Sequence, residues 1–230
     1  MVVTGARVWT LRDGTEHPTG VWAEELAEPH RIFTEAGWDI TVATPDGSTP
    51  VVDKLSLTLA GMPWKRKRIE RYLESIADEL ARPMALWKAD ESDYDLVFYP
   101  GGHGPMEDLA YDETSGRLLA ARLHSGRPLA LLCHAPAATA AARNDDGSYA
   151  FSGWRMTGLS NAEERLNPFP WWKAKWLLED KMKEEGILYE KGLLPLRPYV
   201  VVDRNLYTGQ NPQSSDALAN RLVAEISALS

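Results

Sequence analysis

Cys133, the only cysteine in the chain, stands between two short segments of contrasting character. The apolar residues 128–132 before it are typical of a strand, and the small residues 134–138 after it favour a helix. A side chain at such a junction projects above the edge of a sheet, and unpaired N–H groups at the helix start stabilise a thiolate. We therefore expect a nucleophilic thiol whose pKa lies below that of a free cysteine. The alternative is a small, buried and unreactive side chain, the commonest role of a free cysteine.

The placement of the histidines limits the bases that this thiol can use. Only His134 follows Cys133 in the sequence. The others all precede it: His17, His30, His103 and His124. Papain-like proteases and glutamine-hydrolysing amidotransferases take their base from a histidine far downstream of the cysteine. This pattern argues against glutamine hydrolysis and leaves His134 or an upstream histidine as the base.

A glycine-rich loop, residues 100–105, follows a strand-like apolar run. Gly101 and Gly102 permit backbone geometry and a close approach that a side chain would forbid. Their backbone N–H groups, together with that of His134, would form an oxyanion hole beside Cys133. The alternative is an ordinary turn between a strand and a helix.

A carboxyl group close to the thiol would share a proton with it and later move protons on a substrate. Glu25 lies early in a helix expected over Val21–Ala36 and is one candidate. Periodicity alone does not select it over its neighbours Glu24 and Glu28. Each of the three is also explained as a solvated surface acid.

A second carboxyl group, Glu164, is a candidate third member of a catalytic triad, in which it would orient His134. The same stretch also matches a capping box, because an acid follows Ser160 or Asn161 at the third position. That interpretation explains Glu163 or Glu164 without any catalytic role.

Tryptophans gather after Cys133: Trp154, Trp171, Trp172 and Trp176. They could wall a pocket and exclude water from it. Core packing or a dimer interface is the alternative use of these side chains.

Strand-like and helix-like segments alternate along the chain, which predicts an α/β fold with a mostly parallel sheet covered by helices on both faces. The expected strands are Val2–Gly5, Asp39–Ala43, Leu96–Tyr99, Leu129–Leu132 and Tyr199–Val202. The expected helices are Val21–Ala36, Ile69–Ala81, Thr114–His124, His134–Arg143, Trp171–Glu185 and Ser214–Leu229. A hairpin is expected between Tyr149–Phe151 and Trp154–Thr157. Such sheets bind ligands at the carboxyl ends of their strands, where Cys133 and the glycine loop would meet.

Composition sets the broad class of protein. The chain has 230 residues, 44% of them hydrophobic, and a formal net charge of −8. We expect a single domain over residues 1–230, with neither a nucleic-acid nor a membrane partner. A lone cysteine forms no internal disulfide and no thiolate-built zinc or iron–sulfur site, and the N-terminus lacks the features of a signal peptide. A cytoplasmic location fits these features best.

Three blocks of sequence, in this order, are highly specific: residues 95–105 (DLVFYPGGHGP), 133–137 (CHAPA) and 208–215 (TGQNPQSS). With the opening residues 17–26 (HPTGVWAEEL), they make the chain resemble the ThiJ/PfpI superfamily, which has the class I glutamine amidotransferase-like fold. Within it, the chain is similar to the branch of heat-shock chaperones and cofactor-independent glyoxalase III enzymes. The similarity covers nearly the whole chain.

The resemblance implies a flavodoxin-like three-layer sandwich with a nucleophile elbow at Cys133 and with His134 as its partner. It selects Glu25 as the acid beside the thiol and Glu164 as the third member of the triad. It implies no metal and no other cofactor, a small aldehyde as the substrate, and we expect a homodimer. Methylglyoxal or a related 2-oxoaldehyde would become a 2-hydroxy acid through a hemithioacetal on Cys133.

Other functions remain open at this point. Deglycation of proteins or nucleotides would extend the same chemistry, and a stress chaperone would use exposed apolar surface without needing Cys133. A cysteine amidase or peptidase would use the same Cys133 and His134, and an open cleft would favour it over a narrow pocket. A redox-sensing thiol is a further alternative. Ala135 departs from the glycine that many relatives carry after the Cys-His pair.

Overall fold

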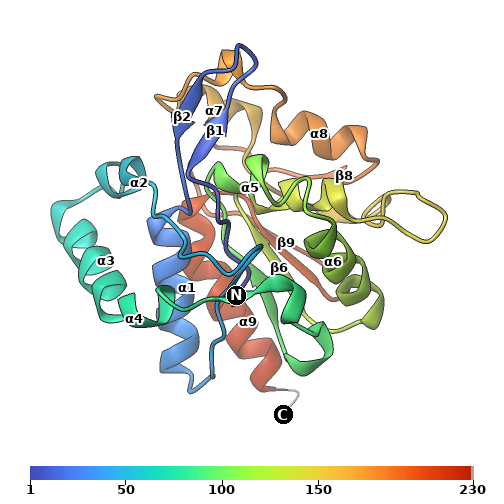
Figure 1. The fold of residues 1–230 in the computed structure, drawn as a ribbon, viewed down its shortest axis with the longest axis horizontal. Coiled ribbons are helices and arrows are strands. Elements are labelled where there is room, and N and C mark those ends of the chain that lie inside the picture. Colours follow the sequence, from blue (N-terminus) through green and yellow to red (C-terminus); the bar gives the residue numbers. More distant parts are fainter. Residues whose placement is uncertain (229–230) are drawn as a thin grey trace.

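A four-stranded sheet lies at the centre of the computed structural model, which describes residues 1–228 (Figure 1). Its strands, in spatial order, are β5 (Val97–Tyr99), β6 (Leu129–Leu132), β10 (Leu206–Gly209) and β9 (Val200–Asp203). The β5–β6 and β6–β10 pairs are parallel, whereas β9 runs antiparallel to β10. Every residue of β6 is fully buried, as expected for a central strand that is covered on both faces.

The N-terminal segment extends this sheet beyond β5. The N–H of Val2 donates to the Phe98 carbonyl at 2.8 Å, and the N–H of Val3 donates to the Ala43 carbonyl at 2.8 Å. Strand β3 (Ala43–Thr44) in turn pairs in parallel with β4 (Met84–Ala85). The strands predicted at Val2–Gly5 and Asp39–Ala43 are therefore in place, but regular pairing covers only part of each.

Helices flank the sheet in two groups. Helix α1 (Ala23–Glu35) packs along α9 (Ser215–Ser227), and Figure 1 shows this pair to one side of the strands. On the other side, α6 (Glu113–Ser125) packs against η3 (Ala135–Ala141), the 3₁₀ helix that follows Cys133. The predicted mixed α/β fold with mostly parallel strands is confirmed.

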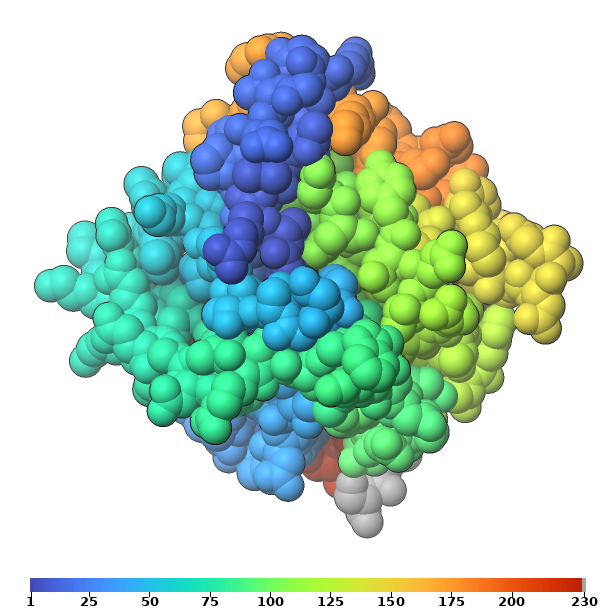
Figure 2. All heavy atoms as spheres, in the orientation of Figure 1, coloured from blue at the N-terminus to red at the C-terminus, as the bar shows by residue number. Residues whose placement is uncertain are grey.

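The remaining elements lie outside this sheet and these four helices. They are β1 (Val8–Thr10), β2 (Glu16–Pro18), α2 (Lys54–Thr58), α3 (Pro63–Ser75), α4 (Ala77–Leu80), η1 (Leu86–Lys88), η2 (Glu91–Asp93), α5 (Gly104–Glu107), β7 (Arg155–Met156), α7 (Asn161–Leu166), η4 (Trp171–Lys173), α8 (Leu178–Glu184), β8 (Leu188–Tyr189) and η5 (Pro212–Ser214). The β1–β2 hairpin reaches the segment around η4, where the N–H of Arg12 donates to the Lys173 carbonyl at 2.8 Å. Figure 2 shows these two segments, blue and orange, in contact at the top of the molecule.

Two local predictions are wrong. The hairpin expected from 149 to 157 does not form, because β7 pairs in parallel with the distant β8. The helix expected over Trp171–Glu185 is divided into η4 and α8 by a turn around 174–177. The helix expected over His134–Arg143 is present, as a 3₁₀ helix over Ala135–Ala141.

None of the helices in residues 1–228 is both long enough and apolar enough to cross a membrane.

Candidate active site

Cys133 lies on the tight turn between β6 and η3, where the sequence predicts a strand-to-helix junction. Its φ of +58° is unusual for a residue that carries a Cβ atom. Hydrogen bonds hold the turn from both sides: the Cys133 N–H donates to the Gly209 carbonyl at 2.8 Å, and the Leu159 N–H donates to the Cys133 carbonyl at 3.0 Å. Backbone strain that is held in this way is characteristic of functional sites.

His134 and Glu164 adjoin the thiol in the order expected of a triad. The Cys133 Sγ lies 3.6 Å from His134 Nδ1, and His134 Nε2 lies 2.6 Å from Glu164 Oε2. An ionised carboxylate only accepts hydrogen bonds, so the network assigns the His134 proton to Nε2. The lone pair of Nδ1 is then directed at the thiol.

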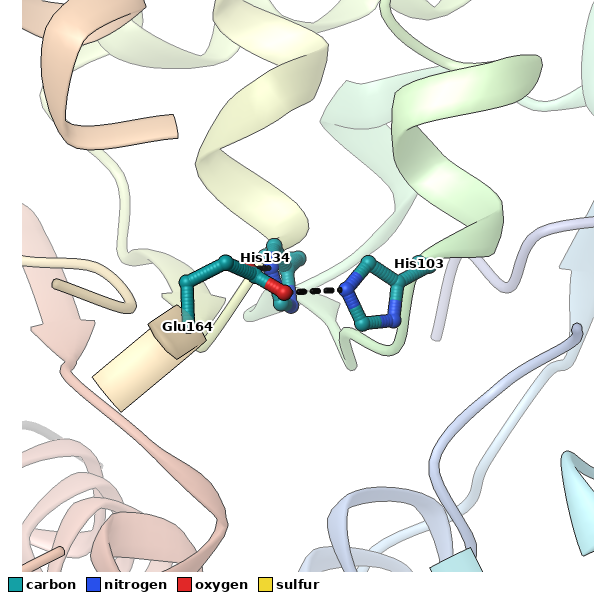
Figure 3. A group of neighbouring side chains, drawn as sticks. All are labelled: His103, His134 and Glu164. Atoms are coloured by element: carbon teal, nitrogen blue, oxygen red, sulfur yellow. Dashed lines mark hydrogen bonds and ion pairs between the residues drawn. The ribbon is translucent and has the colours of Figure 1, made fainter. Parts of the chain in front are cut away.

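His103, an upstream histidine to which the sequence assigns no specific role, completes this group. Its Nε2 lies 2.9 Å from Glu164 Oε1, so the carboxylate bridges two imidazoles (Figure 3). The His103 ring stacks on Trp9 with ring centroids 4.4 Å apart, and its centroid lies 4.2 Å from that of His134. The signal that could have identified His103 is its position just after β5, at the same edge of the sheet as Cys133.

The two imidazoles determine the charge of Glu164. Burial opposes its ionisation, but the charges and hydrogen bonds of His103 and His134 outweigh burial and hold the pKa of Glu164 below its usual range. Burial, followed by the charge of His103, lowers the pKa of His134 against the opposing effect of Glu164. At neutral pH the group therefore contains one carboxylate and a neutral His134.

Glu25, in the first turn of α1, approaches Cys133 from another side. Its side chain is fully buried, and its Oε2 accepts the Gly101 N–H at 2.8 Å. Burial raises the pKa of Glu25 to about 8, despite hydrogen bonds from Cys133 and Gly101. Its Oε1 has no hydrogen bond of ordinary geometry to any other residue in 1–228. The proton of the neutral acid therefore belongs on Oε1.

The predicted depression of the Cys133 pKa is wrong. Burial, and then the proximity of Glu25, raise the pKa of this thiol well above that of a free cysteine. The helix N-terminus favours the thiolate, but the complete burial of the sulfur disfavours it more strongly. The thiol must therefore lose its proton to a base at the moment of reaction.

The predicted oxyanion donors are only partly available. The Gly101 N–H is already engaged by Glu25, which removes it from the expected set. Within residues 1–228, the backbone N–H groups of Gly102 and His134 donate no hydrogen bond. A Cβ atom at Gly101 would come within 2.5 Å of the Leu132 carbonyl oxygen, so the loop can approach the Cys133 turn only with glycine there.

A cavity of about 200 Å³ opens onto Cys133, His103 and His134. Its other lining residues are mostly apolar and include Trp22, Leu59, Leu159, Leu166, Pro168, Leu196 and Pro212. The four tryptophans that were considered as pocket walls do not line this cavity. Trp22, from the loop before α1, contributes the aromatic wall instead.

The capping interpretation applies to Glu163 and not to Glu164. Ser160 and Glu163 form a complete capping box at the start of α7. Glu163 also accepts side-chain N–H groups from Gln210 and Asn211 at 2.8 and 2.7 Å. Two adjacent acids thus have different tasks: Glu163 ties α7 to the loop after β10, and Glu164 faces the histidines.

Comparison with known proteins identifies the family. Residues 18–225 match the DJ-1/PfpI family. The chain belongs to the DJ-1/PfpI family. The resemblance inferred from the three sequence blocks is thereby confirmed.

The names of individual relatives match the branch of the family that the sequence resembles. The protein/nucleic acid deglycase HchA of Pseudomonas aeruginosa (strain UCBPP-PA14) is 29% identical over 235 residues, which cover 95% of this chain and 77% of the relative. The solved structure of glyoxalase III from Candida albicans is 23% identical, with a TM-score of 0.81, and the match covers 97% of this chain and 93% of that chain. The rapid encystment protein of Francisella tularensis is 22% identical, with a TM-score of 0.84 and coverage of 98% and 97%. At these identities the two structures show the fold alone.

The name of the HchA relatives bears on the expected partners. It includes both protein and nucleic acid as objects of deglycation. The expectation that nucleic acid is excluded as a partner, which rested on the net charge of −8, is therefore not supported.

Proposed function

We propose that this protein converts methylglyoxal or related small 2-oxoaldehydes into 2-hydroxy acids without a cofactor, as glyoxalase III enzymes do. The observation that carries the proposal is the surroundings of Cys133. A neutral base, His134, and a neutral acid, Glu25, both adjoin the sulfur, which faces a small cavity. The strained turn at Cys133 serves as the nucleophile elbow of this site.

The first step is addition of the thiol to the aldehyde carbon. His134 Nδ1 takes the thiol proton as the carbon–sulfur bond forms, and Glu164 stabilises the resulting imidazolium through Nε2–H. The former carbonyl oxygen accepts the N–H groups of Gly102 and His134 and gains a proton from this imidazolium. The product is a neutral hemithioacetal, and His134 is again neutral.

The second step moves hydrogen between adjacent carbons. His134 removes the proton from the hemithioacetal carbon, while Glu25 Oε1 donates its proton to the neighbouring carbonyl oxygen. His134 returns the proton that it took to that second carbon, and the hydroxyl group on the first carbon gives its proton back to Glu25, so that the first carbon becomes the carbonyl of a 2-hydroxy thioester and both residues regain their starting states. Water then cleaves the thioester and restores the thiol, so that methylglyoxal and one water give one lactate.

Deglycation is the second candidate. The HchA relative, whose match covers 95% of this chain, is named a protein/nucleic acid deglycase. A hemiaminal formed by methylglyoxal on an amine of a protein or of a nucleobase contains the same three-carbon unit. The same thiol, base and acid would process it after release or transfer of that unit to Cys133. The apolar mouth formed by Leu59, Leu166 and Leu196 favours adducts on apolar protein segments.

A peptidase is less well supported. The cavity of about 200 Å³ is below the roughly 300 to 1,000 Å³ typical of sites for drug-sized ligands. It admits a three-carbon aldehyde more readily than an extended peptide.

The test is lactate formation from methylglyoxal in the absence of glutathione and of added metal. We expect turnover by the wild type and none by Cys133→Ser, whose hydroxyl is a far weaker nucleophile in this setting. Lack of turnover by a wild-type protein with its thiol confirmed as reduced would refute the glyoxalase proposal. Release of free amine from a methylglyoxal adduct in the same sample would then favour deglycation.

A further inference from the structure

Three buried side chains at the site form a potential set of metal ligands. One ligand atom from each of His103, His134 and Glu164 lies within 4.8 Å of the others, and each residue is at most 3% exposed. Two imidazole nitrogens and one carboxylate oxygen are donors that suit zinc and related transition-metal ions. No other trio of histidine, cysteine or acidic side chains in residues 1–228 meets the same criterion.

The geometry is close to what a zinc ion needs. Ligand atoms on a tetrahedral zinc lie roughly 3.3 Å apart, given bonds of about 2.0 Å. His103 Nε2 lies 2.9 Å from Oε1 of Glu164, and His134 Nε2 lies 2.6 Å from Oε2 of the same carboxylate (Figure 3). Both rings thus present Nε2 to Glu164, and a zinc ion requires these nitrogen-to-oxygen separations to widen by several tenths of an ångström. The stacking of His103 on Trp9, at 4.4 Å, fixes the orientation of this ring before any ion arrives.

The surroundings of the three side chains provide a route for an ion and allow His103 to change its tautomer. His103 and His134 both line the cavity, so an ion can reach them and retain a water ligand there. The Nδ1 of His103 has no hydrogen-bond partner within residues 1–228. A shift of its proton from Nε2 to Nδ1 therefore breaks no bond other than the one to Glu164.

We propose that His103, His134 and Glu164 form an inhibitory site for a divalent transition-metal ion, with zinc as the preferred ion. Metal binding through Nε2 moves the His134 proton to Nδ1, the atom that faces Cys133. His134 can then no longer accept the thiol proton, so Cys133 loses its base. Binding is independent of the proposed activity, whereas its inhibitory effect rests on that activity.

A competing arrangement uses the thiol instead. Cys133 Sγ and His134 Nδ1 lie 3.6 Å apart and could hold zinc between them as thiolate and imidazole. Cys133→Ala separates the two arrangements, because it removes the sulfur but retains the three proposed ligands. His103→Phe makes the opposite change, since it retains an aromatic ring for stacking but removes one ligand.

The experiment is isothermal titration of zinc chloride into the full chain. We expect one zinc per chain in the wild type and in Cys133→Ala, and at least tenfold weaker binding in His103→Phe. His17→Asn is the matched control, because His17 is close enough to feel the charge of His103 but is not one of the three ligands. Binding that is lost in Cys133→Ala, or unchanged in His103→Phe, would overturn the proposal.

Two further measurements keep the test decisive. Thermal melting checks that each variant is folded, and Glu164→Ala, which removes a different ligand, should weaken zinc binding if His103→Phe fails to fold. The rate of Cys133 alkylation by iodoacetamide should fall at least fivefold when zinc saturates the wild type and should recover with a chelator. Alkylation that zinc leaves unchanged would contradict the inhibitory role. Because neither readout needs turnover, failure of the zinc site is distinguishable from failure of the glyoxalase proposal.

Discussion

Glu25 and Glu164 are both buried beside the Cys133–His134 pair, yet they have opposite charge states. Glu25 has a single backbone N–H partner, and burial raises its pKa to about 8. Glu164 lies between two imidazoles, which hold its pKa below the usual range in spite of burial. The difference shows that the number and kind of hydrogen-bond donors, and not depth, decide whether a buried carboxyl group is an acid or an anion.

This contrast gives the site its division of labour. The ionised Glu164 orients His134 and favours its role as a base, whereas the neutral Glu25 retains a proton to donate. Two carboxyl groups with pKa values displaced in opposite directions are a general way to obtain acid and base chemistry at one pH.

The largest expected effect is the loss of turnover in Glu25→Gln, a variant that has no acidic proton at this position. Glu25→Gln keeps the size and neutrality of the acid but cannot transfer a proton, so we expect turnover to fall by about 10² to 10⁴-fold. Steady-state lactate formation measures this. Glu28→Gln is the control, because Glu28 is a buried acid one turn later on α1 that pairs with Arg31 and Arg68. A comparable loss in Glu28→Gln would point to damage to the helix and not to lost proton transfer.

Glu25→Gln and Glu164→Gln should change the free energy of unfolding in opposite directions. Folding raises the pKa of Glu25 from 4.5 to about 8. The contribution of Glu25 to the free energy of unfolding is therefore fully present below pH 4.5 and is lost as the pH rises towards 8. At pH 7, Glu25→Gln should therefore raise the free energy of unfolding, by up to about 3 kcal/mol. Urea denaturation of both variants measures the difference.

Glu164→Gln should have the opposite effect. The folded-state pKa of Glu164 is lowered, so its stabilisation is present above 4.5 and is lost as the pH falls. Removal of this carboxylate from between two imidazoles should cost roughly 2 to 4 kcal/mol at pH 7. If both variants were destabilised equally, the two carboxyl groups would not differ in charge as we infer.

The smallest expected effects are shifts in the acidic limb of the pH–rate profile. Glu164 raises the pKa of His134 and His103 lowers it. The apparent pKa of the acidic limb should therefore fall in Glu164→Gln and rise in His103→Phe, each by up to about one unit. Residual turnover measured between pH 5 and 8 tests this, and shifts in the same direction would contradict opposing roles for the two side chains.

The sequence predicted the parts of this site that depend on local pattern. The junction of strand and helix at Cys133 follows from residues 128–138, and adjacency makes His134 its neighbour. The choice of Glu25 and Glu164 came only from the family resemblance. Helical periodicity does not distinguish Glu25 from Glu24, and a capping box explains Glu163 equally well.

Other features depend on contacts between distant segments. His103 meets Glu164 across 61 residues, and Gly101 meets Glu25 across 76, so no local pattern reveals either hydrogen bond. The raised pKa of Cys133 has the same origin, since its burial comes from the packing of several segments around one turn. Strand β10 was missed because Leu206–Gly209 is not a continuous apolar run, unlike β6, and because its partner β6 lies far away in the sequence.

The most direct test of the two charge states is infrared spectroscopy of the carboxyl groups. Burial also raises the pKa of Glu185, to about 7. At pH 7.5 we therefore expect a C=O stretching band of a protonated carboxylic acid that is mostly lost in Glu25→Gln and retained in Glu164→Gln. This band should fade in the wild type as the pH rises through about 8, the pKa of Glu25. A wild-type spectrum without this band, or loss of the band in Glu164→Gln alone, would contradict the assignment of Glu25 as the neutral acid and Glu164 as the anion.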